Sequence, residues 1–211
     1  MFAKNIYQPI PALEMKRIIT IILVFLSIQI HAQDLKHLND VASNDGIPKG
    51  KAIIYGNFIQ RLGFSSGGFP QDIRLINTDT KEVFAFRVMP TFKSSKENTF
   101  IYTIEPGHYA ILNYWWTNSK WYGGKMYTEY IFKNTDTTDG FEDKVNAGLI
   151  NIDELERFTF KITENSLNYL GTWHFKTPPV SFTNDKVILD NKIKNKYKAI
   201  DFSQANVVMP N

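Results

Sequence analysis

The sequence contains no cysteine among its 211 residues. This absence excludes a disulfide framework, thiolate metal ligands and a lipid-anchored cysteine. The sequence also lacks a large excess of charge of either sign. Residues 1–32 hold three of the 24 basic and one of the 21 acidic residues, which leaves 21 against 20 in the remainder. We therefore expect no nucleic-acid partner and no electrostatic attraction to an anionic membrane, since both need a concentrated basic patch. The basic run Lys192–Lys198 is interpreted as the solvated face of a short helix.

Histidines are few and widely spaced. After residue 32 only His37, His108 and His174 remain, and no two of them stand at a metal-ligand spacing such as H-x-H or H-x-x-x-H. A lone histidine in or beside a strand is more often a hydrogen-bonded structural residue than a ligand or a catalytic base. We therefore expect no zinc site, no cofactor and no histidine-based catalysis.

A single long apolar run occurs, near the N-terminus. Lys16 and Arg17 precede the apolar stretch Ile18–Ile30, and His31-Ala32-Gln33 supplies a small residue at a cleavage point. As a helix, this stretch would span about 20 Å, which is shorter than a hydrocarbon core of about 30 Å and disfavours an uncleaved anchor. We predict a secretory signal cut after Ala32, with the true start at Met15. The mature protein is then expected in the periplasm or outside the cell, not integral to the membrane.

No internal repeat and no linker divides the mature chain. We expect a leader segment at residues 33–50 and one domain at residues 51–211, after the upstream extension and signal of residues 1–32. In the leader, the spacing of Leu35, Leu38 and Val41 permits a short helical turn. The polar residues that follow would end this turn before Pro48.

Short apolar segments separated by turn signals make up the domain. Lys51–Leu62 is apolar on both faces, as in a strand buried on two sides. Asp72–Ile76 and Glu82–Val88 flank the turn-forming residues Asn77–Lys81 and predict a hairpin. Pro106-Gly107 predicts a type II turn, because proline presets φ and glycine accepts positive φ. Further strands are predicted at residues 99–105, 108–116, 126–132, 157–162, 167–175 and 187–189.

The C-terminal part contains the one predicted helix of note. Asp190 or Asn191 can cap it, and Ile193, Tyr197 and Ile200 would then share one face. Many short strands joined by turns, with almost no helix, predict an all-β fold. We expect an antiparallel β-sandwich of about nine strands with a short C-terminal helix.

Two short segments carry a resemblance to known domains. Thr103–Tyr109 reads as a strand followed by Pro-Gly-x-Tyr, and Asn168–Gly171 lies near the end of the predicted sandwich. Both segments resemble transthyretin-like and carboxypeptidase-regulatory-like sandwich domains of secreted bacterial envelope proteins. The resemblance implies a non-catalytic cell-envelope domain. These families share no agreed ligand, so no binding residue is carried over.

Two motifs suggest chemistry that their context opposes. Gly63–Gly67 matches the G-x-S-x-G pattern of a hydrolase nucleophile elbow, but Gly68-Phe69-Pro70 follows where that elbow needs a helix. An acidic stretch offers oxygen ligands near a glycine, although its spacing fails the EF-hand rule, and a solvated loop is the simpler interpretation. The residues of this weak calcium candidate are Asn134, Asp136, Asp139 and Glu142.

The strongest candidate site is a cluster of aromatic residues interleaved with polar ones. Neighbouring strand residues point to opposite faces, so Trp115 and Trp116 cannot both lie in one core unless both sheet faces are covered. Exposed aromatics beside amides suit the stacking of sugar rings or a protein hot spot. The alternative is that Trp121 and Tyr122 fold back as a lid on the core. The predicted ligand-binding residues are Asn113, Trp115, Trp116, Lys120, Trp121 and Tyr122.

Together these features predict a secreted or periplasmic, non-catalytic binding or interaction module of the bacterial cell envelope. A glycan or an envelope protein would be its partner. Two other classes stay open: a structural subunit of an envelope assembly, which would expose a long strand edge or apolar patch, and a hydrolase, which would need converging carboxylates or a Ser-His pair.

Overall fold

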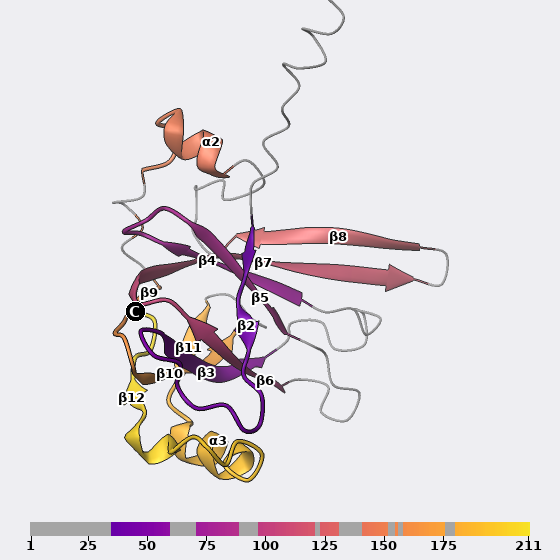
Figure 1. The fold of residues 1–211 in the computed structure, drawn as a ribbon. Helices are drawn as coiled ribbons and strands as arrows, with labels where there is room; N and C mark the ends of the chain where they lie inside the picture. Colours follow the sequence, from indigo (N-terminus) through magenta and orange to yellow (C-terminus); the bar gives the residue numbers. More distant parts are fainter. Residues whose placement is uncertain are drawn as a thin grey trace, which may run out of the picture. The chain divides into compact units, whose positions relative to one another are not determined.

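Two β-sheets account for most of the structure (Figure 1). The structure is a computed structural model, and it describes residues 35–59, 71–88, 97–120, 123–130, 141–151, 155, 158–175 and 180–211. For Gln71, Glu97 and residues 116–120, 126–130 and 141–142 the backbone alone is described. Within these ranges no helix has the length and apolar character needed to cross a membrane.

The first sheet, called sheet A, has the order β1 (Lys36–His37), β5 (Val83–Val88), β4 (Gln71–Asn77), β7 (Gly107–Lys120) and β8 (Gly123–Tyr130), and β9 (Thr159–Ile162) also pairs with β7. Sheet B has the order β11 (Ser181–Thr183), β10 (Leu167–His174), β3 (Ala52–Ile59), β6 (Glu97–Ile104) and β2 (Asn39–Asp40), and β12 (Asn206–Val207) pairs with β10. The helices are α2 (Phe141–Asn146), α3 (Lys186–Ile193) and the 3₁₀ turn η3 (Phe202–Gln204).

The predicted all-β class is confirmed. The described residues form twelve strands, of which β1, β2 and β12 have two residues each and the other nine are longer. The sheets are mixed and not wholly antiparallel, because β1 pairs with β5, and β10 pairs with both β3 and β12, in parallel. Turn signals in a sequence indicate reversals, and they do not tell which sheet the next strand joins.

Aromatic side chains from both sheets meet in the central core. Phe86 of sheet A and Phe100 of sheet B have ring centroids 5.0 Å apart, and Tyr114 of sheet A lies 5.2 Å from Phe175 after β10. Trp173 of β10 is fully buried among them, and its indole Nε1 donates a hydrogen bond of 2.8 Å to the Leu170 carbonyl. The two sheets therefore face each other across one apolar interior, as in a sandwich.

Both outer sheet faces are also covered in part. Leu189 and Ile193 of α3 pack with Tyr55 on the outer face of sheet B. Ile150 and Leu155 pack against the outer face of sheet A. This double covering explains why the strand predicted from Lys51 is apolar on both faces, and every residue from Ala52 to Phe58 is buried. The β4–β5 hairpin and the half-buried strand β9 are likewise confirmed.

The connection at Pro106-Gly107 differs from the predicted hairpin turn. The strands before and after it exist, but β6 belongs to sheet B and β7 to sheet A, so the chain crosses between sheets here. Gly107 has φ +153°, and a Cβ atom on it would lie 2.6 Å from Asn77 Nδ2. Glycine is thus required by conformation and by space, although not for a type II hairpin.

Two further expectations are wrong in detail. The leader forms strands β1 and β2, not a helical turn, because its backbone finds partners on the edges of both sheets. At the C-terminus, residues 187–189 lie in α3 and not in a strand, and this helix ends at Ile193. Tyr197 and Ile200 follow the helix and are still buried beside it.

Candidate functional site

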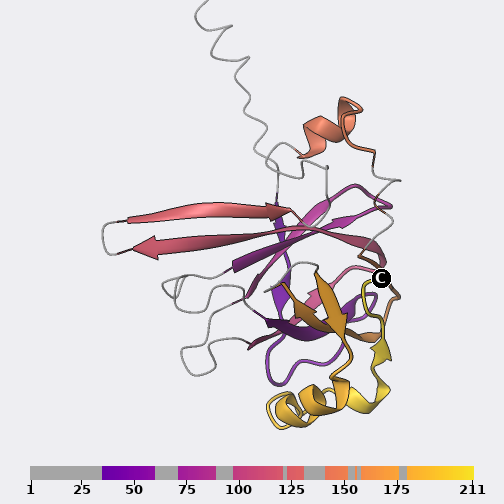
Figure 2. The same cartoon turned by 180° about the vertical axis from the view of Figure 1, so that it is seen from behind.

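The β7–β8 hairpin extends beyond the rest of sheet A. Pairing between β4 and β7 ends at Asp72 opposite Trp115, whereas pairing between β7 and β8 continues to Lys120 opposite Gly123. Five residue pairs therefore lie past the last contact with β4. Figures 1 and 2 show this two-stranded ribbon projecting past β4. We call residues 116–127 the arm.

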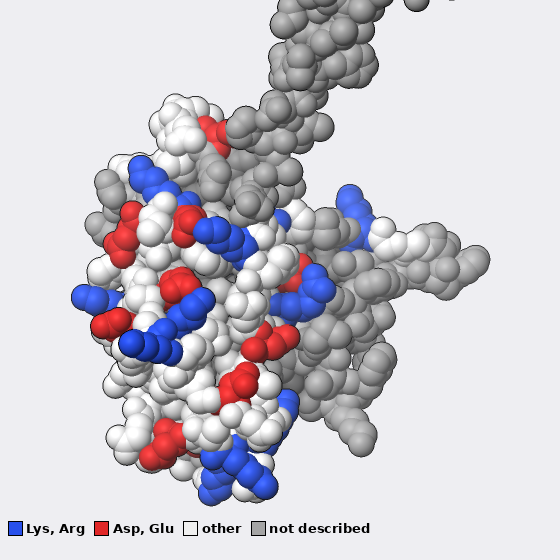
Figure 3. All heavy atoms as spheres, viewed as in Figure 1, with Lys and Arg blue, Asp and Glu red and all other residues white. Residues whose placement is uncertain are grey.

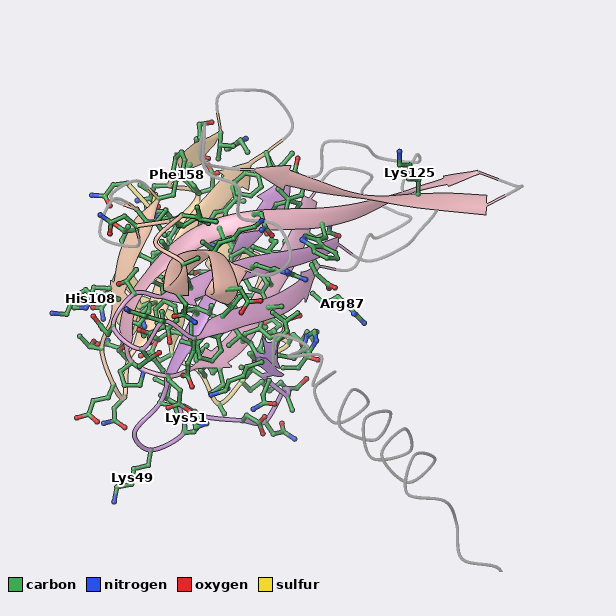
Figure 4. All side chains as sticks on the ribbon, turned by 90° about the horizontal axis from the view of Figure 1, so that it is seen from above. Lys49, Lys51, Arg87, His108, Lys125 and Phe158 are labelled. Carbon is green, nitrogen blue, oxygen red and sulfur yellow. The ribbon has the colours of Figure 1, made fainter. Side chains whose placement is uncertain are left out.

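An isolated two-stranded ribbon is marginally stable in water, because it buries little apolar surface. The arm nevertheless has an aromatic sequence that includes Trp116, Trp121, Tyr122 and Tyr127. Trp116 and Lys120 of the predicted site belong to its β7 strand, while Trp121 and Tyr122 lie outside the described residues. Lys125 is exposed on the β8 strand of the arm (Figure 4).

A stacked pair marks the base of the arm. The Arg74 guanidinium carbon lies 3.8 Å from the centre of the Trp115 ring system, a distance typical of a cation–π contact. The guanidinium group is largely buried, and the indole of Trp115 is half-buried. The Trp115 Nε1 atom is buried and has no hydrogen-bond acceptor among the described residues. The base therefore holds an oriented, half-buried indole whose N–H group points away from solvent.

A surface ion pair lies beside this stack. Asp72 stands opposite Trp115 on β7 and opposite Arg87 on β5. Arg87 Nε donates to Asp72 Oδ1 at 3.0 Å, and this hydrogen bond, with the charge of Asp72, raises the pKa of Arg87. Arg87 remains exposed and points away from the sheet (Figure 4). The row Arg87–Asp72–Trp115 thus places a charged pair next to an aromatic ring.

Asn113 lies inside the structure, not on its surface. The register between β4 and β7 shifts between Ile111 and Asn113, which is the mark of a bulge. Asn113 stands opposite Arg74 on one side and Tyr130 on the other, and its exposed fraction is 0%. It cannot offer its amide to a ligand at the surface, so the expected hydrogen bond from Asn113 to a bound sugar has no basis in this position.

Sequence reasoning missed the charged residues beside Trp115. The signal that could have found them is the alternation Asp72-Ile73-Arg74-Leu75, which places two charged residues on the face opposite the core. Only the pairing register of β4 with β7, which the sequence does not give, brings Arg74 against Trp115.

The other sequence candidates are placed apart from the arm or are not described. Gly63–Gly67 and the calcium candidates Asn134, Asp136 and Asp139 lie outside the described residues, and Glu142 belongs to α2. His108 Nδ1 contacts the Asp79 carboxylate at 3.0 Å, and His174 Nε2 lies 2.7 Å from Thr183 Oγ1. In the described ranges, no three histidine, aspartate or glutamate residues gather as metal ligands would.

Fold and site together define an all-β protein of two mixed sheets with a projecting aromatic hairpin. No protein-family model matches the chain, and comparison with curated proteins finds no match. A leucine-rich repeat protein from Bacteroides thetaiotaomicron VPI-5482 is similar over 61% of this chain, with 11% identity and a TM-score of 0.32. The match spans 14% of that protein's length. A similarity this low carries no argument about fold or function.

Proposed function

We propose that this protein is a secreted, non-catalytic binding module of the bacterial cell envelope that contacts its partner through the arm. The observation that carries the proposal is the continuation of β7–β8 pairing for five residue pairs beyond the last contact with β4. A ribbon that leaves the sheet contributes little to the core. Its aromatic sequence is better explained by contact with another molecule.

The residue types of the arm favour a glycan or a protein surface as the partner. Trp and Tyr rings stack on the apolar faces of sugar rings, and they are also enriched at the energetic centres of protein interfaces. At the base, Arg74 orients Trp115, whose half-buried indole leaves part of its ring surface for contact with the partner. Lys120 and Lys125 would supply further donors along the arm.

The cellular address in the proposal is supported by the N-terminal sequence alone. The basic pair at Lys16-Arg17, the apolar stretch and the small residue at Ala32 are typical of a cleaved secretory signal. The mass of the protein recovered from the periplasm or the medium tests this point. Cleavage after Ala32 gives a chain that begins at Gln33.

Alanine variants on the arm test the binding role. We expect Trp116→Ala and Trp121→Ala to abolish or strongly weaken capture on a glycan array or by envelope extracts, because each removes an aromatic contact surface. We expect the melting temperature to change little, since the arm lies beyond the sandwich. Leu149→Ala, at a 76% exposed position beyond α2, is the matched control and should bind normally. Unchanged partners together with a large loss of thermal stability would instead place these tryptophans in the core.

A structural subunit of an envelope assembly is the second candidate. The described residues give β8 a partner on one side only, namely β7, so β8 is an edge strand of sheet A. Exposed edges are templates for pairing with another chain. Self-association of the purified protein that is lost when proline replaces Thr128 would favour this candidate over a glycan partner.

A further inference from the structure

We propose that the outward face of α3 and the lysines that follow it form a second contact surface, which binds the surface of an anionic lipid bilayer. This surface comprises Val187, Ile188, Lys192, Lys194 and Lys196. It lies on the outer side of sheet B and shares no residue with the arm on sheet A. The inference is independent of the partner that the arm binds.

The orientation of α3 is fixed by its inward face. Leu189 and Ile193 are buried against sheet B. Lys186 Nζ donates to Asp190 Oδ2 at 2.6 Å, and Tyr55 of β3 donates to the other carboxylate oxygen at 2.7 Å. These contacts anchor one side of the helix to the sheet. The opposite side is therefore held outward as a fixed surface.

Two aliphatic side chains occupy that outward side. Val187 is 74% exposed and Ile188 is 72% exposed, which places them among the most exposed large apolar residues described. Single exposed aliphatic residues are ordinary on protein surfaces. Here two neighbours on one helix face remain uncovered by any described part of the chain, so they can insert into an apolar layer together.

Lysines surround this apolar pair. Lys192 follows Ile188 by four residues, so both lie on the same helix face. Lys194 Nζ donates to Asn191 Oδ1 at 2.8 Å, and Asn191 in turn follows Val187 by four residues. Lys196 and Lys198 are exposed just beyond the helix end. Figure 3 shows basic side chains gathered at the α3 end of the molecule.

Nearby carboxylates do not cancel this positive charge. Residues 185–201 contain five lysines against Asp185, Asp190 and Asp201, so this segment keeps a net charge of +2. The near balance of charge over the whole chain therefore conceals a local basic excess. The sequence interpretation of Lys192–Lys198 as one helix face is also wrong, because only Lys192 lies within α3.

An anionic bilayer explains both parts of the surface. Lysines attract anionic headgroups, and aliphatic side chains gain by entering the boundary between headgroups and acyl chains. A nucleic acid would use the lysines and leave the aliphatic pair in water. With two aliphatic residues and a few lysines, the expected binding is reversible and depends strongly on salt and lipid composition.

The absence of cysteine allows a direct test. A single Ile188→Cys variant carries an environment-sensitive fluorophore at that position, and Leu149→Cys, at a 76% exposed site beyond α2, is the matched control. The probe is a vesicle of phosphatidylcholine with or without phosphatidylglycerol. We expect a blue shift and increased intensity at position 188 with phosphatidylglycerol only, reversed by high salt, and no change at position 149.

A charge variant separates lipid binding from general stickiness. Lys192→Gln with Lys194→Gln should weaken binding to the anionic vesicles by about thirtyfold. Lys49→Gln, at an exposed loop position, should leave binding unchanged. The proposal is overturned by the absence of a spectral change at position 188, by equal changes at both labelled positions, or by equal binding to uncharged vesicles. The surface would instead be a polyanion site, for nucleic acid or a similar molecule, if two results occur together. A soluble polyanion would displace the vesicles, and the label at position 188 would give no signal.

Discussion

Gly56 lies in the middle of β3, where the structure has no room for a side chain. A Cβ atom on this residue would lie 2.5 Å from the backbone carbonyl oxygen of Gly171 and 2.7 Å from the ring of Phe100. Backbone atoms of a neighbouring strand cannot move aside without breaking the sheet. Glycine is therefore required here for close packing between β3 and β10, not for an unusual φ.

This close approach predicts a strong effect of one methyl group. We expect Gly56→Ala to lower the free energy of unfolding by about 1–3 kcal/mol, the usual cost of overpacking. Gly46→Ala is the matched control, because a Cβ atom there meets nothing within 4 Å. It should change stability by less than about 0.5 kcal/mol. Urea unfolding followed by tryptophan fluorescence measures both, and equal stability of the two variants would contradict the packing of β3 against β10.

The sequence predicted a candidate site at the tryptophans but not the separate environments of their side chains. The predicted opposition of Trp115 and Trp116 concerns a side chain, that of Trp116, outside the described part of the chain. Tyr114 and Trp115 do face opposite sides, since Tyr114 is in the central core and Trp115 stacks on Arg74 outside it. Asn113 was expected beside a ligand and is fully buried. Asn113 stands opposite Arg74 beside the β4–β7 bulge, and no local residue pattern reveals this register.

Among the elements, α3 is attached to sheet B by one partly buried ion pair in addition to its apolar contacts. The side chains of Lys186 and Asp190 are 16% and 18% exposed, and Lys186 also donates to the Phe202 carbonyl at 2.7 Å. Burial and the hydrogen bond to Asp190 raise the pKa of Tyr55, so its hydroxyl stays protonated and donates at all physiological pH values.

Removal of this carboxylate should loosen the helix from sheet B. We expect Asp190→Ala to cost about 1–3 kcal/mol of unfolding free energy, because the Lys186 ammonium and the Tyr55 hydroxyl both lose an acceptor. Lys51→Ala breaks an ion pair with Glu105 whose side chains are 40% and 51% exposed, and should cost less than about 1 kcal/mol. Faster hydrogen exchange confined to α3 in Asp190→Ala would support this role of the carboxylate. A larger loss of unfolding free energy in Lys51→Ala than in Asp190→Ala would refute it.

The strand predicted at residues 187–189 is part of α3 in the structure. This error shows the limit of predicting elements from local residue patterns. Val187-Ile188-Leu189 is a short apolar run with β-branched residues, which favours a strand on local grounds. Contacts made over long sequence distances decide otherwise, because Tyr55 binds Asp190 across 135 residues. The leader is a similar case, since residues 36–40 become strands only where the edges of β5 and β6 accept them.

For the whole molecule, crossings between the sheets determine the topology, because the chain changes sheet five times from β1 to β12. The chain passes from sheet B to sheet A at Pro106-Gly107 and returns between β9 and β10. The return brings β10 beside β3 in parallel, which makes sheet B mixed. Composition and turn residues were enough to predict the all-β class and most strands. The partner of each strand is set by the packing of both sheets around the shared aromatic core, which local patterns do not encode.

We propose that the arm serves binding and not the stability of the sandwich. Replacement of residues 116–127 by Asn-Gly tests it most directly, because this turn closes a two-residue hairpin directly beyond the pair Trp115–Thr128. All pairing between β4 and β7 is retained. We expect this variant to unfold at an unchanged urea midpoint and to capture no partner. Retained capture, or a variant that no longer folds, would contradict it.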